Sequence, residues 1–196
     1  MIYLNLVFKF SKIIKTEVND MINKDVAAML NDQITHEFYA GYLYLSMAAQ
    51  AEDMNLPGFA NWFYVQHQEE HTHAMNIFKY LVEQGVKVSL KEIKAPKVSW
   101  ENPVEMAKDA LKHEEMVTTL FNKIMDVAHS NKDYASISFM NWYIDEQVEE
   151  EAGAKEVIQK FERAENRAAL LFIDAELAKR VFTPVLPVKA TPVQLA

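Results

Sequence analysis

The sequence predicts an all-α protein built as a four-helix bundle, and three observations support this prediction. The chain of 196 residues contains only 4 Gly and 6 Pro, so long stretches are free of helix breakers. Apolar residues recur at intervals of three and four along four long segments, as in helices with one buried face. One connection is much longer than the few residues that usually join antiparallel neighbours, which indicates a crossover along the bundle.

The first two helices are predicted on either side of one tight turn. Apolar residues follow a helical period over 25–53, which predicts the first long helix. The segment 55–58 contains an adjacent Pro and Gly and is expected to form a turn. A second apolar stripe runs from residue 59 until Gly85 stops the pattern, which predicts the second helix.

The second half of the chain repeats this arrangement after the long connection at 85–102, where the helical period is lost. The third helix is expected to begin at Pro103, a residue suited to a first helical turn, and to close at the turn 131–133. The fourth helix is expected over 137–163. A shorter apolar segment at 168–180 is expected to form a fifth helix, too short to be an equal member of the bundle.

The two ends of the chain are predicted to lie outside the functional domain, which spans 24–180. Residues 1–23 are expected to be an N-terminal extension, because two lysines interrupt its apolar stretch and no cleavage site follows. That stretch is also too short to span a bilayer. Residues 181–196 contain three prolines and no period, so we expect a flexible tail.

Composition limits the kinds of chemistry and of partner. The chain has no cysteine, so a metal would have to be bound by histidine and carboxylate side chains, and a reducing compartment, the cytoplasm, is favoured. The formal net charge of -8 disfavours binding to nucleic acid or to an anionic membrane. Cations are therefore the expected small partners.

Each of the four predicted long helices carries a polar or acidic side chain on the stripe that should be buried. On one helix alone, the simpler interpretation is a charge turned toward solvent. Burying several carboxylates costs several kcal/mol each unless cations or protons compensate, and no Lys or Arg lies on these stripes near the acids. We therefore expect metal ions, and oxygen ligands with one imidazole suit iron or manganese. The residues concerned are Glu37, Glu70 with His73, Glu114, and Gln147 with nearby Glu150.

The residues around these acids fall in four short strings, 30–37, 68–73, 112–114 and 145–151. With Tyr44, which lies two helical turns after the first acid, these strings resemble the bacterial non-haem ferritins. The resemblance covers the predicted bundle and the short fifth helix. It implies a ferritin-like four-helix bundle with a long crossover between helices two and three and a short C-terminal helix.

The resemblance also implies a pair of iron sites inside each subunit. Glu37, Glu70 and His73 would hold one iron. Glu114 and Glu150 would hold the other, with Glu70 bridging the two. The Glu70-x-x-His73 spacing agrees with this assignment, because residues three apart lie on one helix face.

Further residues are assigned by the same resemblance. Gln147 would lie beside the iron pair, and Tyr44 would lie near it as a hydrogen-bonding group and electron donor. Glu69, Glu146 and Glu149, with Glu150 shared, match the acids that supply a third iron site in bacterial ferritins. Without the resemblance, these three are only an acidic surface stripe, and the tyrosine is an ordinary core residue.

The implied function is iron storage with ferroxidase activity. Hard carboxylate ligands favour ferric over ferrous iron, so two adjacent ferrous ions would readily pass electrons to oxygen. The ferric product would be deposited as mineral inside a hollow homo-oligomeric shell of about twenty-four subunits, the number that the resemblance implies. No haem is expected, because Gln147 and Glu150 stand where a bacterioferritin would have a second Glu-x-x-His motif.

Three alternatives were weighed against this interpretation. A rubrerythrin-type peroxidase usually carries a cysteine-ligated iron domain, which this chain cannot contain. A zinc peptidase is suggested by His67, Glu70 and His71 in an H-x-x-E-H pattern, but His71 should point away from the buried stripe. His71, His113 and His129 are expected at the surface or in interfaces. A purely structural bundle without metal would leave the acids on four helices unexplained.

Overall fold

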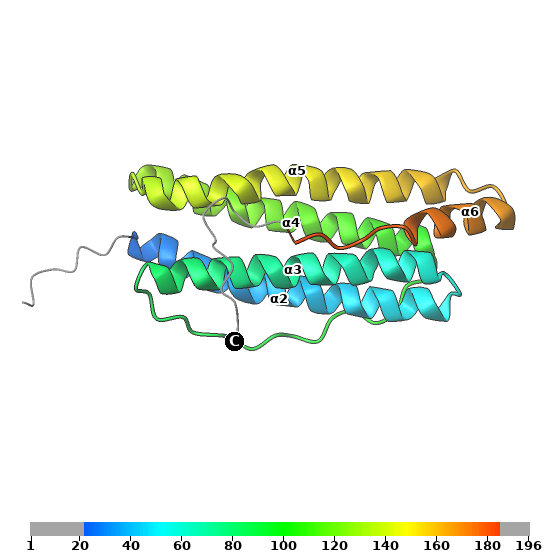
Figure 1. Cartoon of the computed structure of the whole chain (residues 1–196), viewed down its shortest axis with the longest axis horizontal. Coiled ribbons are helices and arrows are strands. Elements are labelled where there is room, and N and C mark those ends of the chain that lie inside the picture. Colours follow the sequence, from blue (N-terminus) through cyan, green and yellow to red (C-terminus); the bar gives the residue numbers. More distant parts are fainter. Residues whose placement is uncertain (1–21, 185–196) are drawn as a thin grey trace, which may run out of the picture.

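The computed structural model describes residues 22–184, and this part of the chain forms five helices and no strands (Figure 1). The predicted all-α fold, with its four long helices, long crossover and short fifth helix, is confirmed. The helices are α2 (Lys24–Asp53), α3 (Pro57–Glu83), α4 (Pro103–Ser130), α5 (Tyr134–Glu162) and α6 (Arg167–Leu177). None of them is both long and apolar enough to cross a membrane.

The four long helices lie side by side as two antiparallel pairs, α2 with α3 and α4 with α5 (Figure 1). The connection from α3 to α4 runs along the length of the bundle and returns the chain to the end at which α3 began (Figure 1). Helix α6 lies at one end and packs mainly against α3. This topology brings the middle turns of all four long helices to the same level.

Local signals set the helix ends. The Asn23 side chain caps α2, and its backbone N–H donates to Asp133, whose side chain in turn caps α5. Helix α3 begins at Pro57, inside the segment predicted as a turn, because the fixed φ of proline suits a first helical position. Gly85, at φ 77°, follows the end of α3 as expected.

The long crossover is tied to the bundle by polar contacts. The Asn31 side chain makes two 2.8 Å hydrogen bonds with the backbone of Ser89. Ser46 donates a hydrogen bond to the carbonyl of Lys97 at 2.7 Å. Trp100, near the end of the connection, is buried. These contacts give the long connection a fixed path over the bundle.

The core is divided into two apolar halves with a polar layer between them. One half surrounds Phe59 and Phe63 and the other surrounds Phe121 and Tyr143. In every long helix the residues between these halves include buried polar side chains. They are Glu37, Gln66, Glu70, His73, His113, Glu114, Gln147 and Glu150. The acids that the sequence placed on buried stripes therefore meet at mid-bundle.

The predicted terminal segments are largely outside the described residues. The structure describes neither 1–21 nor 185–196, so the proposed N-terminal extension and flexible tail remain predictions. The described remainder of the tail, 181–184, contains no helix or strand. The first helix begins at Lys24, where the functional domain was expected to start.

Candidate metal centre

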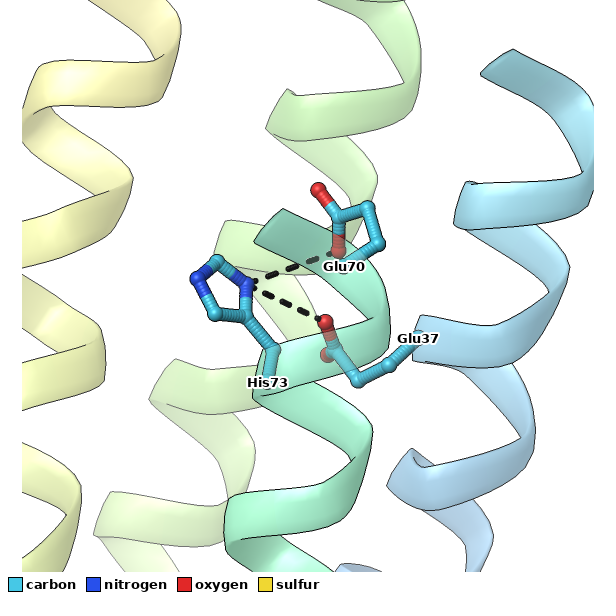
Figure 2. Close-up of side chains that lie close together, drawn as sticks. All are labelled: Glu37, Glu70 and His73. Carbon is cyan, nitrogen blue, oxygen red and sulfur yellow. Dashed lines mark ion pairs between the residues drawn. The ribbon is translucent and has the colours of Figure 1, made fainter. Parts of the chain in front are cut away.

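Three of the predicted ligands converge in the polar layer (Figure 2). Figure 2 shows Glu37 reaching from α2 toward Glu70 and His73, which project from adjacent turns of α3. The His73 Nδ1 atom lies 3.6 Å from Glu37 Oε2 and 3.5 Å from Glu70 Oε2. Ligand atoms of all three lie within 4.8 Å of one another, and each residue is almost completely buried.

The close approach of α2 and α3 at this level depends on Gly41, one turn after Glu37. A Cβ atom on Gly41 would lie 3.2 Å from His67 Nδ1 and 3.5 Å from the Glu70 Cβ. The same His67 nitrogen is 3.0 Å from the Gly41 carbonyl oxygen. Glycine therefore lets the two helices pack closely enough for their carboxylates to meet.

The three side chains of this group strongly influence one another's protonation. Burial opposes a charged imidazole, but the nearby carboxylates of Glu37 and Glu70 outweigh it and hold the pKa of His73 well above its usual range. Burial also raises the pKa of Glu70 well above its usual range. For Glu37 burial acts in the same direction, but the nearby His73 and Glu70 side chains lower its pKa overall.

Glu114 lies on the other side of the layer, held by two partners. The Tyr44 hydroxyl donates to Glu114 Oε1, and the Gln147 amide donates to Oε2 and to the Glu114 carbonyl, both at 3.2 Å. Burial, followed by the charge of Glu150, raises the pKa of Glu114 to about 8. Burial and the charge of Glu114 raise the pKa of Tyr44 well above its usual range.

Glu150 is buried and accepts a 2.7 Å hydrogen bond from Gln66 Nε2. In the part of the chain that the structure describes, Glu114 and Glu150 are not members of the tight group that Glu70 forms with His73. The layer thus contains one compact three-ligand group and two further buried carboxylates nearby. Along with burial, the charges of Glu114 and Glu37 both help to raise the pKa of Glu70.

The three acids predicted for a third site lie at the edge of the layer. Glu69 and Glu146 are partly buried and Glu149 is exposed. Burial raises the pKa of Glu69 to about 7, against the opposing charge of Arg180. Burial likewise raises the pKa of Glu146.

Arg180 is a basic residue beside one of the third-site acids, although it lies on none of the buried stripes. Its Nη2 atom lies 2.7 Å from Glu69 Oε2. The residue follows α6, far along the chain from any buried stripe, so a search along the stripes could not find it. Glu69 already has a basic partner. Within residues 22–184, Glu37, Glu70 and Glu114 make no ion pair with Lys or Arg, and the contacts of Glu37 and Glu70 are with His73.

Amide and hydroxyl side chains around the site were also missed. Gln33 donates to Glu37 Oε1 at 2.6 Å, and Gln66 donates to Glu150. The Tyr143 hydroxyl donates to the His73 carbonyl at 3.0 Å. Gln66 could have been selected from the sequence, because it lies on the same buried stripe as the acids.

His113 was expected at a surface or interface, and this expectation was wrong for the subunit. The side chain is buried against Tyr39 and Tyr44, because α2 and α4 are in contact at this level. Burial lowers the pKa of His113 to about 4, so the ring is neutral at pH 7. His71 and His129 are exposed, as predicted.

The structure does not assemble the peptidase pattern. His71 is exposed and its ring packs 5.6 Å from Phe38, whereas His67 is partly buried and bonded to a backbone carbonyl. Within 22–184, the single group of three or more potential metal ligands is Glu37, Glu70 and His73. Its Glu37 Oε2 atom is buried without a hydrogen-bond partner, which fits an oxygen that is available to a cation.

We predict that divalent cations displace protons from this layer. At pH 7 most Glu114 side chains are protonated, because their pKa is about 8. Binding of two metal ions in the layer should therefore release about one proton from Glu114 alone. Calorimetry with Zn²⁺ in buffers of different ionisation enthalpy measures the release. The Glu114→Gln variant should release about one proton fewer, and the number released should fall as the pH rises above 8. Buffer-independent heats at pH 7 would contradict the assignment.

Comparison with known proteins gives a consistent family relationship. The ferritin-like domain family matches residues 27–164. The chain is 39% identical over 163 residues to the bacterial non-heme ferritin of Staphylococcus haemolyticus, covering 83% of this chain and 98% of that protein. A Staphylococcus aureus protein of the same name is 38% identical over 163 residues, with the same coverage.

Solved structures agree with this relationship. The open-pore ferritin of the archaeon Archaeoglobus fulgidus superimposes with a TM-score of 0.80 at 40% identity, covering 82% of this chain and 99% of that chain. An engineered closed form of that ferritin gives a TM-score of 0.81 at 41% identity, covering 83% and 99%.

Proposed function

The chain belongs to the ferritin-like family, and from this premise we propose that it stores iron by oxidising Fe(II) with oxygen and depositing Fe(III) mineral inside a hollow shell. The observation that carries the proposal is the buried group of Glu37, Glu70 and His73. Glu114 and Glu150 lie in the same polar layer between two apolar halves of the core. Buried acids on four helices are costly unless cations neutralise them.

In this proposal two ferrous ions bind side by side as substrates. Glu37, Glu70 and His73 hold the first, Glu114 and Glu150 hold the second, and Glu70 bridges them. Each ion gives one electron, and the two electrons with two protons reduce one O₂ to hydrogen peroxide. The carboxylates favour the ferric products because hard oxygen ligands stabilise the higher charge.

Other residues of the layer have supporting roles in this proposal. Gln147 orients Glu114 through the hydrogen bond that it donates to that carboxylate. Tyr44 donates a hydrogen bond to the other oxygen of Glu114, and its proposed role is to donate an electron to the irons. Glu69, Glu146 and Glu149 are the proposed ligands of a third iron, with Glu150 shared between this site and the pair. No haem is proposed, and the cytoplasmic location remains a prediction.

A shell of identical subunits is the proposed assembly, and the surface of α6 supports a subunit contact there. Leu171 and Phe172 are 57% and 72% exposed, although both are large apolar side chains. Exposed apolar side chains that cluster on one short helix often mark an interface. The number of subunits, about twenty-four, comes from the resemblance to bacterial ferritins.

The proposed function is tested by adding Fe²⁺ in air to the purified protein and measuring oxidation, solubility and mass together. We expect rapid oxidation and a soluble ferric core that co-migrates with an assembly of about 24 subunits in analytical ultracentrifugation. Apoferritin-sized particles without iron should appear when the same sample is reduced and chelated. A monomer or dimer whose iron precipitates would refute storage.

A further inference from the structure

The segment 178–184 after α6, here called the C-terminal strap, is fastened to α3. The Asn61 amide donates to the carbonyl of Arg180 at 2.9 Å and to that of Leu177 at 3.3 Å. At the other end of the same contact, Asp174 accepts a 2.9 Å hydrogen bond from the Phe59 N–H. These bonds fix the backbone from which the Arg180 side chain projects.

The Arg180 guanidinium makes four contacts with three residues of α3. Its Nη2 donates to Glu69 Oε2 at 2.7 Å. Its Nη1 donates to Gln66 Oε1 and, at 3.4 Å, to the carbonyl of Trp62. The guanidinium carbon also lies 5.0 Å from the centre of the Trp62 ring, in a cation–π contact.

The contact extends from Arg180 into the buried layer through Gln66. While its carbonyl oxygen accepts from Arg180, the Gln66 amide nitrogen donates to Glu150 Oε2 at 2.7 Å. Arg180 therefore fixes which way the Gln66 amide faces, and so holds the Glu150 carboxylate indirectly. Two of the acids proposed for the third iron, Glu69 and Glu150, are thus engaged by one network.

We propose that Arg180 is a built-in cation that closes the third iron site until an incoming metal ion displaces it. The proposal rests on the function proposed above, because that function assigns Glu69 and Glu150 to iron. An arginine side chain keeps its charge at all physiological pH values, so it cannot leave Glu69 by losing a proton. A divalent ion bound to Glu69 would repel the guanidinium. The metal ion and Arg180 therefore cannot both remain in contact with Glu69.

One consequence concerns the order of filling. Within residues 22–184, Arg180 reaches the proposed ligands of the iron pair only indirectly, through Gln66 and Glu150, whereas Glu69 of the third site must first release the guanidinium itself. The third ion should therefore bind more weakly than the pair. Its arrival should free Arg180 from Trp62 and Gln66, which links filling of this site to the position of the strap.

The test is anaerobic titration with Fe²⁺ at pH 7, measured by equilibrium dialysis and calorimetry. Wild-type protein should bind two ions per subunit tightly and a third weakly. The Arg180→Gln variant should bind the third at least about tenfold more tightly, because the competing charge is removed. Arg180→Lys, which keeps the charge but loses the planar fork, should lie between the two.

Two further variants control for charge and for site. Lys179→Gln removes the same charge from the neighbouring exposed residue and should leave all three affinities unchanged. Adding Glu149→Ala to Arg180→Gln should abolish the gain, since the extra ion would lose a proposed ligand. If the double variant loses the tighter binding of the third ion, that tighter binding belongs to the third site.

If the Arg180→Gln variant does not assemble, the proposal can still be tested by fluorescence in protein that keeps Arg180. Trp142 lies 5.3 Å from His73 and would report on the pair, so Trp100 and Trp142 are replaced by Phe. With redox-inert Zn²⁺, the emission of the remaining Trp62 should change at the third equivalent, when the guanidinium leaves its ring. Arg180→Lys should change at a lower Zn²⁺ concentration.

The outcomes separate the two proposals. If two ions bind tightly and neither Arg180 variant strengthens the third, or Trp62 emission is constant throughout, the strap does not close the site and the storage function stands. If the wild-type protein binds all three ions with equal affinity, the strap likewise does not close the third site. If no ion binds tightly to the wild-type protein, both proposals fail.

Discussion

Replacing Glu70 with alanine should lower the initial rate of Fe²⁺ oxidation by more than about 100-fold, because loss of an outer partner alone commonly costs 10- to 100-fold at metal sites. Glu70 is proposed to contact both ions, so its loss removes one ligand from each. Stopped-flow absorbance of the ferric product, with two Fe²⁺ per subunit, measures this initial phase. His73→Ala should have a similar effect, because it removes the one imidazole of the group.

The matched control is one residue away. His71→Ala removes an exposed imidazole on the same helix and should change the rate less than about twofold, as expected for a surface substitution without partners in the layer. Under a zinc-peptidase reading the order would reverse, because His71 would be a ligand and His73 would not. Oxidation that stops in His71→Ala but survives in His73→Ala would therefore overturn the assignment on α3.

Stability of the metal-free protein distinguishes a functional Glu70 from a structural one. Burial holds the folded-state pKa of Glu70 above its ordinary value of 4.5, so the native state loses stability relative to the unfolded state as the pH rises above 4.5. Glu70→Gln keeps the shape and removes this titration. At pH 8 it should melt at the same temperature as the wild type or higher, although oxidation is lost.

Gly58→Ala should disrupt the docking of α6 against α3, because an added Cβ meets its closest contact at this glycine. A Cβ at Gly58 would lie 1.7 Å from the carbonyl oxygen and 2.6 Å from the carbonyl carbon of Asp174. These are backbone atoms of α6, so no side chain can turn aside and the helix itself must shift. Overpacking typically costs about 1 to 3 kcal/mol, and here the hydrogen bond that the Phe59 N–H donates to Asp174 would be lost as well.

The expected readout is a fall of about 5 °C or more in melting temperature, since 1 kcal/mol corresponds to roughly 2 to 4 °C for a domain of this size. Trp62, which packs beneath the strap, should become more exposed and its emission should shift to longer wavelength. Gly153→Ala is the matched control, because nothing lies within 4 Å of its added Cβ. It should raise stability by up to about 1 kcal/mol, as in other helix interiors. Equal melting temperatures for the two variants would show that α6 is not docked as described.

Most of the fold could be predicted from the sequence because each long helix carries an apolar stripe with clear ends. Periodicity selected the stripes of Leu30 and Phe63, and Pro103 marked the start of α4 where the structure has it. The start of α3 was placed too late, because Pro57 was read as part of a turn. Proline is compatible with both, and local sequence alone does not decide between them.

The candidate site was only partly predictable, because side chains from distant segments complete it. Glu37, Glu70 and His73 follow from buried stripes, and the structure brings them together. The contact of Arg180 with Glu69 spans 111 positions and depends on how α6 docks. His113 was misplaced because its burial depends on the contact between α2 and α4, which periodicity within one helix does not reveal.

The most direct test of the central claim is to locate iron inside the bundle. Crystals of the assembled protein, soaked anaerobically in Fe²⁺, would be measured at the iron absorption edge for anomalous scattering. We expect two strong peaks in the polar layer, one contacting Glu37, Glu70 and His73 and the other Glu114 and Glu150, with Glu70 touching both. Iron found at the exposed His71, or no iron between the four long helices, would contradict the account.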